Sequence, residues 1–368
     1  MLSPHSIRKQ TLWRHPPLHR NGAAEARVTV VIPCYNYGRY LSACVRSALD
    51  QEGVRVDLVI VDDASTDDSA EVAARLAASN DRVKLIRNDK NSGPVSTFNR
   101  GLEHARGEFL VRLDADDLLT PGSLARAVTV ARQLPSVGLI YGHPLHFTAD
   151  RLPCARSKVT AWTVWPGLEW LGDRCRSGYN VITSPEAVMR MSVVERVGGQ
   201  QPLAHTHDME MWLRIAAFSD VAYIHGVDQA WHREHSASLS ARKVDGYRDL
   251  VERHLAFETL FRGVAGGNPR VAKLRAVAMT AIARSALQSA IHCLDHGQAN
   301  SPQMQRFLEV ANQTGSDLTE LPEWRALMRR FSRDPQSLAR DPAILLERIM
   351  RRLSDTLKWR RWHRSGVF

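Results

Sequence analysis

The sequence lacks the features that mark membrane-spanning, secreted and disulfide-bonded proteins. It contains no run of about 18 apolar residues, the length of a transmembrane helix, and its most apolar stretch, 276–294, is interrupted by Arg284 and Gln288. Only five cysteines occur among 368 residues, without metal-ligand spacing, which favours reduced thiols in the cytosol. The basic N-terminal residues include no apolar core, so we expect no secretory signal.

Two glycine-rich phosphate-binding motifs are also missing. Neither the G-x-G-x-x-G of dinucleotide-binding folds nor the G-x-x-x-x-G-K-[ST] of P-loop proteins occurs in the chain. A phosphate group bound by this protein would therefore be held by side chains and a metal ion rather than by a glycine-rich loop.

Net charge is concentrated at the two ends of the chain. The total is +10, and residues 1–27 and 341–368 contribute +4 each, which leaves +2 for the body between them. A nearly neutral body argues against a nucleic-acid-binding groove, so we expect no nucleic-acid partner. Basic ends suit contact with an anionic surface.

The middle of the chain alternates between short β-branched segments and amphipathic segments of helical length. We expect strands at 28–32, 56–61, 83–86, 109–113 and 138–141, and helices at 40–50, 67–78 and 123–134, with a further helix reaching Ala105. This alternation predicts right-handed crossovers and an α/β fold with a mostly parallel sheet flanked by helices. A helix at 208–218 and a strand at 221–224 follow, and the chain is helical from about residue 244.

Polar or acidic residues follow three of the expected strands, at 33–36, 62–63 and 114–117. In parallel α/β sheets, ligands bind beyond the carboxyl ends of the strands. The last of these segments places three carboxylates within four residues, which is unfavourable unless a cation neutralises them. Such ligands suit Mg²⁺ or Mn²⁺ together with substrate phosphates. The alternative is a solvated turn in which an aspartate caps the next helix.

Seven collinear motifs carry a family resemblance: V-I-P-C-Y-N at 31–36, V-D-D-A-S-T at 61–66, N-x-G at 91–93, L-D-A-D-D at 113–117, V-G-G at 197–199, H-D-x-E-x-W-L-R at 207–214 and R-x-H-x-x-S at 233–238. Together they resemble the inverting glycosyltransferase family 2, which has the GT-A fold. The resemblance implies a GT-A domain over residues 27–240. We expect a basic flexible tail over 1–26 before it and a helical C-terminal region over 241–368 after it.

The resemblance implies a role for each matching position. Donor-binding residues would be Pro33, Cys34, Tyr35, Asn36, Asp62, Asp63, Asn99, Asp114 and Arg233. The metal ligands would be Asp116, Asp114 and His235, and the ion Mg²⁺ or Mn²⁺. A carboxylate at 62 or 63 would accept from a pyrimidine imide N–H, and the family's habits favour a UDP-sugar, with GDP- and dTDP-sugars left open. Both aspartates also suit a plain helix N-terminus.

The family's catalytic base is an aspartate at a helix start, and that position here is Asp208. His207 stands where the family usually has glutamate, a variant that could alter the choice of acceptor. Asp208 would deprotonate an acceptor hydroxyl in one inverting displacement, while the metal stabilises the departing diphosphate. A simple helix N-cap is the alternative for Asp208. Glu210 would orient the acceptor or brace Arg214, and Trp212 would pack in the core.

Two departures from the family pattern qualify these roles. Phe98 precedes Asn99 where the family often has arginine, so a phosphate or base contact would be missing or supplied by Arg100 or Arg112. No Q-x-x-R-W element follows the catalytic helix, which favours transfer of a single sugar over processive synthesis.

Residues 342–364 have the pattern of an amphipathic helix with a basic side. Leu346, Met350, Leu353 and Leu357 share one face, and two tryptophans suit the headgroup level of a bilayer. We expect 341–368 either to contact a membrane surface or to dock on the catalytic domain or a second subunit. Because acceptors of this family are often lipid-linked, the protein would be cytoplasmic, with a peripheral position at the inner face of the membrane.

Function is therefore expected to be hexosyl transfer from a nucleotide-sugar to a glycan or lipid-linked glycan of the cell envelope. The alternative is a non-catalytic nucleotide- or glycan-binding subunit of a polysaccharide assembly system. Retention of Asp114, Asp116 and Asp208 favours the enzyme. A nucleotidyltransferase is disfavoured because no glycine-rich, lysine-containing loop follows the first strand.

Overall fold

The structure, a computed structural model, describes residues 9–14, 25–148, 151–235, 245–299, 301–331 and 341–367. The chain divides into two compact units. The first comprises residues 1–171, 182–203 and 207–241, and the second comprises 172–181, 204–206 and 242–368.

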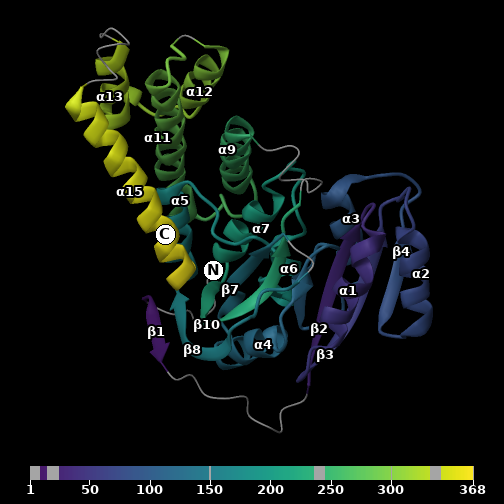
Figure 1. The fold of residues 1–368 in the computed structure, drawn as a ribbon. Helices are drawn as coiled ribbons and strands as arrows, with labels where there is room; N and C mark the ends of the chain where they lie inside the picture. The colour runs from purple at the N-terminus through teal and green to yellow at the C-terminus, as the bar shows by residue number, and fades with distance from the viewer. Residues whose placement is uncertain are drawn as a thin grey trace. The chain divides into compact units, whose positions relative to one another are not determined.

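The first unit is built on one ten-stranded sheet (Figure 1). Its strands are β1 (Thr11–Arg14), β2 (Ala26–Cys34), β3 (Val54–Asp62), β4 (Val83–Arg87), β5 (Phe109–Arg112), β6 (Leu118–Leu119), β7 (Val137–Phe147), β8 (Ser157–Trp165), β9 (Val188–Arg190) and β10 (Asp220–Arg233). Their order across the sheet is β1-β8-β10-β7-β9-β5-β2-β3-β4, and β6 pairs with β10.

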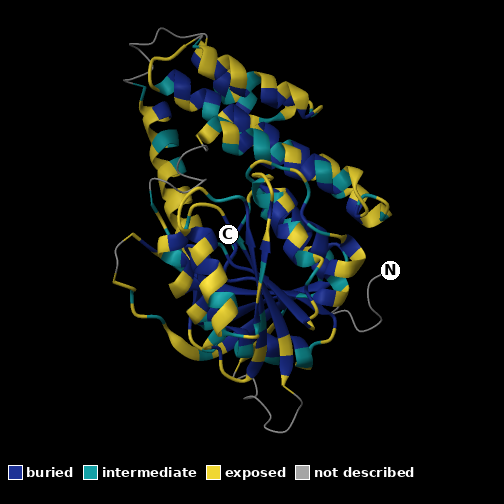
Figure 2. Cartoon of the chain, turned by 90° about the vertical axis from the view of Figure 1, so that its right-hand side faces the viewer, coloured by how far each residue is buried: buried dark blue, intermediate teal, exposed yellow. Residues whose placement is uncertain are grey.

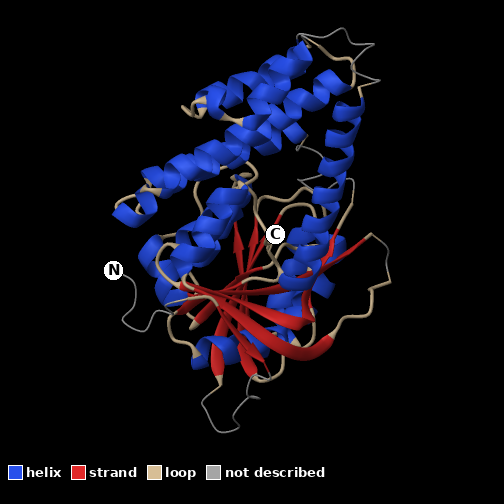
Figure 3. Cartoon of the chain, turned by 90° about the vertical axis from the view of Figure 1, so that its left-hand side faces the viewer, coloured by secondary structure: helices blue, strands red, loops and turns tan. Residues whose placement is uncertain are grey.

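Helices cover the sheet, as Figure 3 shows with helices in blue and strands in red. They are α1 (Gly38–Leu49), α2 (Ser69–Ser79), α3 (Gly93–Leu102), α4 (Ser123–Gln133), α6 (Met191–Val197) and α7 (His207–Ala216). Helix α5 (Gly167–Ser177) begins in the first unit and ends in the second. The expected α/β architecture with a mostly helical C-terminal region is confirmed.

The sheet is parallel in one half and mixed in the other. Strands β5, β2, β3 and β4 pair in parallel, and α1, α2 and α3 connect them. Helices cover both faces of such a sheet, which is why β2 and β3 carry nearly unbroken apolar runs. In the other half β7 and β10 pair in parallel, whereas β8 and β9 run antiparallel to their neighbours.

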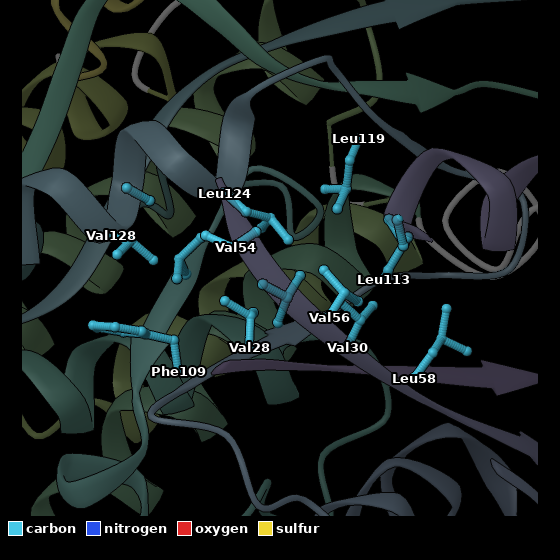
Figure 4. Close-up of a cluster of buried hydrophobic side chains, with 14 of the residues drawn as sticks. Val28, Val30, Val54, Val56, Leu58, Phe109, Leu113, Leu119, Leu124 and Val128 are labelled. Carbon is cyan, nitrogen blue, oxygen red and sulfur yellow. The ribbon is translucent and has the colours of Figure 1, made fainter. Parts of the chain in front are cut away.

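Buried side chains of the parallel half form the main core. Val28 and Val30 of β2 lie with Val56 and Leu58 of β3 in one cluster of buried side chains, and Phe109 of β5 completes this layer (Figure 4). Coloured by burial, the strands are dark blue and the helices turn their exposed residues outward (Figure 2). Each fully buried side chain of this size contributes about 1.5–3 kcal/mol, so the core holds the strand ends in fixed positions.

The N-terminal residues depart from expectation. A flexible tail was expected over 1–26, but Thr11–Arg14 form β1, which pairs antiparallel with β8, Thr11 opposite Val164. The expectation is wrong for these four residues. Their T-L-W-R sequence has strand-forming residues that can extend an existing edge, a preference that charge counting alone does not detect.

The second unit is helical. Its elements are α9 (Gly246–Arg262), α10 (Pro269–Ala272), α11 (Leu274–Asp295), α12 (Pro302–Gln313), the 3₁₀ turn η1 (Leu318–Glu320), α13 (Pro322–Phe331) and α15 (Pro342–Ser365). Among the helices that the structure describes, none combines the length and apolar character needed to cross a bilayer.

A buried carboxylate fastens β10 to the segment before β8. Asp228 is fully buried, its Oδ2 accepts the N–H of Arg156 over 2.7 Å, and its Oδ1 lies 3.1 Å from Nδ1 of His143. Burial opposes ionisation of Asp228, but the hydrogen bonds from His143 and Arg156 outweigh it and hold its pKa well below the usual value.

We expect Asp228→Asn to lower the free energy of unfolding by about 2–3 kcal/mol, somewhat less than a fully buried pair because Arg156 is half exposed. Because the pKa of Asp228 is lower in the folded than in the unfolded protein, its ionised carboxylate stabilises the fold at pH values above the unfolded pKa of about 4. This stabilisation decreases as the pH falls below that value. The free energies of unfolding of the two proteins, measured with urea, should therefore differ most at pH 7, and the difference should narrow as the pH falls from 4 toward 3.

The matched control is Asp173→Asn, whose pair with Arg176 is exposed and whose effect should stay within about 0.5 kcal/mol. A difference between Asp228→Asn and the parent protein that stays constant down to pH 3 would contradict the assignment.

Candidate active site

The carboxyl ends of β2, β3 and β5 lie next to one another at one edge of the sheet. Cys34 at the end of β2 is in register with Asp62 at the end of β3, and the N–H of Asp63 donates to the Cys34 carbonyl over 2.8 Å. On the other side of β2, the N–H of Leu113 donates to the Val31 carbonyl over 3.0 Å. The three loops that carry the predicted site residues therefore start side by side.

The first two loops are joined by Asn36. This residue has φ of +60°, its amide oxygen accepts the N–H of Thr66 over 2.7 Å, and its own N–H donates to the Ser65 hydroxyl over 3.0 Å. The N–H of Gly38 donates to Oδ2 of Asp67 over 3.2 Å. Asn36 was predicted to bind the donor, and in the structure its amide joins the loop after β2 to the loop after β3.

Of the other residues in the first motif, only Tyr35 presents an exposed side chain. The thiol of Cys34 is buried, and burial raises its pKa to about 12, so this side chain is not a reactive group. Pro33 pairs with Val61 within the sheet. A ligand at this edge would meet the backbone of 33–35 and the ring of Tyr35.

The two adjacent aspartates after β3 have different surroundings. The carboxylate of Asp63 accepts three hydrogen bonds, from Nδ2 of Asn88 over 2.6 Å, from the N–H of Ser92 over 2.8 Å and from the N–H of Gly93 over 2.9 Å. Gly93 has φ of +81°, which glycine adopts without strain. Asp63 thus fixes the loop that leads into α3.

Asp62 has no such partners. Both of its carboxylate oxygens are buried and accept no hydrogen bond from any residue that the structure describes, and the nearest charge is Nε of Arg87 at 3.9 Å. A buried carboxylate without a donor is unfavourable, and a ligand N–H would satisfy it.

Arg112 is the cation beneath the D-x-D carboxylates. It is buried, its Nη2 lies 3.0 Å from Oδ1 of Asp114, and its Nη1 donates to Oε1 of Gln200 over 2.7 Å. Gln200 is held in turn by Asn99, whose side chain makes two hydrogen bonds to the Gln200 backbone at 2.8 and 2.9 Å. Asn99, predicted to bind the donor, therefore reaches Asp114 only through this relay.

The C-terminal end of β10 and the residues after it contact Asp116 and Asp117. Nε2 of His235 lies 2.9 Å from Oδ2 of Asp116, and Nε of Arg233 donates to the Asp116 carbonyl over 3.1 Å. The N–H of Arg233 donates to Asp117 over 2.8 Å, and Nδ1 of His232 lies 3.1 Å from the same carboxylate. Burial disfavours a charged ring at His232, but Asp117 outweighs it and raises the pKa of His232 to about 10. Ser238 of this motif lies outside the described residues.

The donor set suits a divalent cation that shares its coordination with a phosphate. Within the described part of the chain, no three His, Cys, Asp or Glu side chains form a group that could hold a metal ion. Mg²⁺ is usually bound by one or two carboxylates, and substrate phosphates and waters complete its shell. Burial, with Asp117 and Asp114 nearby, raises the pKa of Asp116 to about 7, and an added cation would relieve this repulsion. Asp116 and Asp114 therefore fit the expected ion.

Asp208 interacts with the same group of charges. It lies in the first turn of α7, where its Oδ1 accepts the N–H of Met209 over 2.6 Å, and part of its surface stays exposed. The surrounding protein raises its pKa to about 7, since burial and the repulsion from Asp114 outweigh the attraction of Arg112. Asp114 and Asp116 also interact with each other. The candidate base therefore lies within electrostatic range of Asp114 and Arg112.

Three other residues of α7 have structural roles. Glu210 and Arg214 form a buried ion pair at 2.8 Å, so Glu210 braces Arg214, one of the two roles that the sequence left open. Arg214 also donates to the backbone carbonyls of 197–199, which holds the V-G-G turn next to Gln200. Trp212 is fully buried in the core, as expected.

Sequence reasoning assigned no role to Gln200 or His232, and it treated Asp117 only as one of the three carboxylates that a cation would neutralise. Gln200 follows the V-G-G motif directly, and that position could have drawn attention to it. His232 precedes the R-x-H motif, but nothing in its spacing indicates a pairing with a residue 115 positions away.

The fold is that of the GT-A glycosyltransferases. The structure of Staphylococcus aureus TarS 1–349 in complex with UDP-GlcNAc aligns with a TM-score of 0.58 at 16% identity, over 82% of this chain and 83% of that one. Likeness at this level concerns the fold alone.

Sequence comparison identifies the family. The model described as glycosyl transferase family 2 matches residues 29–198. An uncharacterized protein of Mycobacterium tuberculosis is 32% identical over 62% of this chain and 73% of that protein. The succinoglycan biosynthesis protein ExoO of Rhizobium meliloti is 41% identical, but over only 27% of this chain and 28% of that protein. The chain belongs to glycosyltransferase family 2 and is a glycosyltransferase.

We expect Glu210→Gln to lower the free energy of unfolding by about 3 kcal/mol, because it leaves Arg214 buried with an unbalanced charge. The measurement is urea denaturation followed by tryptophan fluorescence. Glu195→Gln, at an exposed position of α6, is the matched control and should change stability by less than about 0.5 kcal/mol. Equal effects of the two substitutions would show that the buried pair has no special role.

Proposed function

We propose that this glycosyltransferase moves one sugar from a UDP-sugar to a hydroxyl of a glycan or lipid-linked glycan, with inversion and with Asp208 as general base. The observation that carries the proposal is the electrostatic link of Asp208 to Asp114 and Arg112, together with the interaction of Asp114 with Asp116. Three interacting carboxylates with perturbed pKa values are typical of a catalytic site.

Asp208 suits the role of base. Its pKa of about 7 makes it a stronger proton acceptor than an ordinary aspartate, and at neutral pH a large fraction is ionised. In the proposed step, the acceptor hydroxyl gives its proton to Asp208 while its oxygen forms the new bond to the anomeric carbon. The bond from that carbon to the diphosphate oxygen breaks, and the electron pair leaves with the diphosphate.

The surrounding residues suit a nucleotide diphosphate. We propose that the unpartnered carboxylate of Asp62 accepts the imide N–H of a pyrimidine base. Asp116, with Asp114 beside it, would hold Mg²⁺ or Mn²⁺, which would supply a positive charge to stabilise the departing diphosphate. Arg233 and His235 contact Asp116 already, so they would lie beside the phosphates and close the site.

The proposed acceptor class also bears on where the protein works. A lipid-linked glycan is met at a membrane surface, so we propose that the protein acts as a peripheral enzyme at the cytoplasmic face.

We expect Asp208→Asn and Asp116→Ala each to reduce donor turnover by about 10²–10⁴-fold, which is typical of the loss of a general base or of an electrostatic stabiliser. The measurement is a hydrolysis and transfer screen over UDP-, GDP- and dTDP-sugars with Mn²⁺ or Mg²⁺. Asp208→Asn should keep metal-dependent UDP binding, whereas Asp116→Ala should lose it.

Asp81→Asn, at an exposed turn, is the control that should leave turnover unchanged. Full turnover by either site variant would overturn the assignment of that residue. UDP binding without turnover of any donor would instead favour a non-catalytic nucleotide-binding subunit.

We expect Asp62→Ala to weaken UDP binding by about tenfold or more, the value of one hydrogen bond to a charged group. Since no described residue donates a hydrogen bond to the Asp62 carboxylate, the substitution should leave the unfolding temperature unchanged or higher. Calorimetric titration with UDP and GDP measures the effect, and Asp68→Asn at a neighbouring exposed position is the control. Unchanged UDP affinity in Asp62→Ala would contradict its role in base recognition.

A further inference from the structure

Helix α15 is fixed to the second unit by one face. Ile344 and Trp362 are buried, and the indole Nε1 of Trp362 donates to the Val181 carbonyl over 2.9 Å. Glu347 lies on the same side and pairs with Arg330 over 2.9 Å. These contacts lie near both ends of the helix, so its orientation on the second unit is set and its opposite face is turned outward.

The outward face, which we call the apolar face of α15, consists of six large side chains. They are Leu345, Leu346, Ile349, Met350, Leu353 and Leu357, and each is between 41% and 62% exposed. Spacings of three and four residues place them along one stripe. Single exposed apolar residues are ordinary on a protein surface, but a contiguous stripe of six marks a surface that contacts something else.

The charges around this stripe are of one sign. Arg360 and Arg364 continue it at the same spacing of three and four residues, and both are exposed. The two carboxylates among the described residues of α15 lie elsewhere: Glu347 is on the fixed side, and Asp355 lies 3.9 Å from Lys358. The exposed Trp359 flanks the basic end.

We propose that the apolar face of α15 lies in the interface of a bilayer that contains anionic lipids. The helix is about 36 Å long at 1.5 Å per residue, enough to lie parallel to the surface with its leucines among the acyl chains and its arginines at the phosphates. Docking of a second copy is less favourable, because paired helices normally balance flanking charges of both signs, whereas these flanking charges are all positive and a parallel pair would place arginine against arginine.

This inference rests on the proposed peripheral position of the enzyme and names the surface that would contact the membrane. Its test measures membrane binding and is therefore independent of donor and base chemistry. Vesicles of phosphatidylcholine with and without phosphatidylglycerol are sedimented with the full chain at low and high salt. We expect binding to the anionic vesicles that exceeds binding to the neutral ones and weakens with salt.

Two adjacent substitutions provide the matched pair. Leu353→Glu adds a negative charge to the apolar face, whereas Ser354→Glu adds the same charge at an exposed position on another side of the helix. We expect Leu353→Glu to reduce the partition coefficient about tenfold or more, and Ser354→Glu to change it by less than about twofold. Circular dichroism of both variants checks that the helical content is preserved.

Equal binding of the two variants, or no binding of the parent chain to anionic vesicles, would overturn the proposal. Sedimentation equilibrium without lipid tests the other occupant: a parent dimer that becomes a monomer only in Leu353→Glu would assign the face to subunit contact instead. Failure of the proposed transferase activity, with vesicle binding intact, would leave this inference standing.

Discussion

The repulsion between carboxylates at one edge of the sheet is the constraint on which the rest of the site depends. Asp114, Asp116 and Asp117 follow β5 in the sequence, and Asp208 joins them from α7. In a partly buried position each additional negative charge raises the pKa of its neighbours, so the group is stable only with nearby cations. Arg112 and the protonated His232 supply two positive charges, and the remaining imbalance is what makes the site suited to a divalent cation.

Hydrogen bonds outside the acidic group keep Arg112 in place. Gln200 and Asn99 hold Arg112, and the Glu210–Arg214 pair holds the turn from which Gln200 comes. These residues act through others rather than on a ligand. They come from α3, from the loop after α6 and from α7, which explains why the family motifs are spread over more than a hundred residues, although the chemistry would occur at one sheet edge.

More of the fold than of the site could be predicted from the sequence. Alternation of apolar runs and helices indicated the parallel half of the sheet, because burial on both faces leaves a strong pattern in β2 and β3. The edge strand β1 and the strands β8 and β9 have weaker patterns, because β1 and β9 have only four and three residues and the first residues of β8 are mostly exposed. The strand of Thr11–Arg14 depends on pairing with β8, which no local signal reveals.

For the site, the motifs brought the right loops together but did not distinguish the adjacent aspartates. Asp63 is used to shape the 91–93 loop, whereas the Asp62 carboxylate accepts no hydrogen bond from the described residues, a difference that arises from tertiary hydrogen bonds. Asn36 and Asn99 matched motif positions, and their amides make hydrogen bonds to Thr66 and to the backbone of Gln200. A motif indicates that a residue matters, whereas only the packing shows what its side chain contacts.

The joining of the first two loops by Asn36 has a consequence for ligand recognition. Because 36–38 and 65–67 are hydrogen-bonded to each other within the protein, the wall they form is preorganised. Association then loses little conformational entropy at that wall, and selectivity there follows from shape rather than from induced closure.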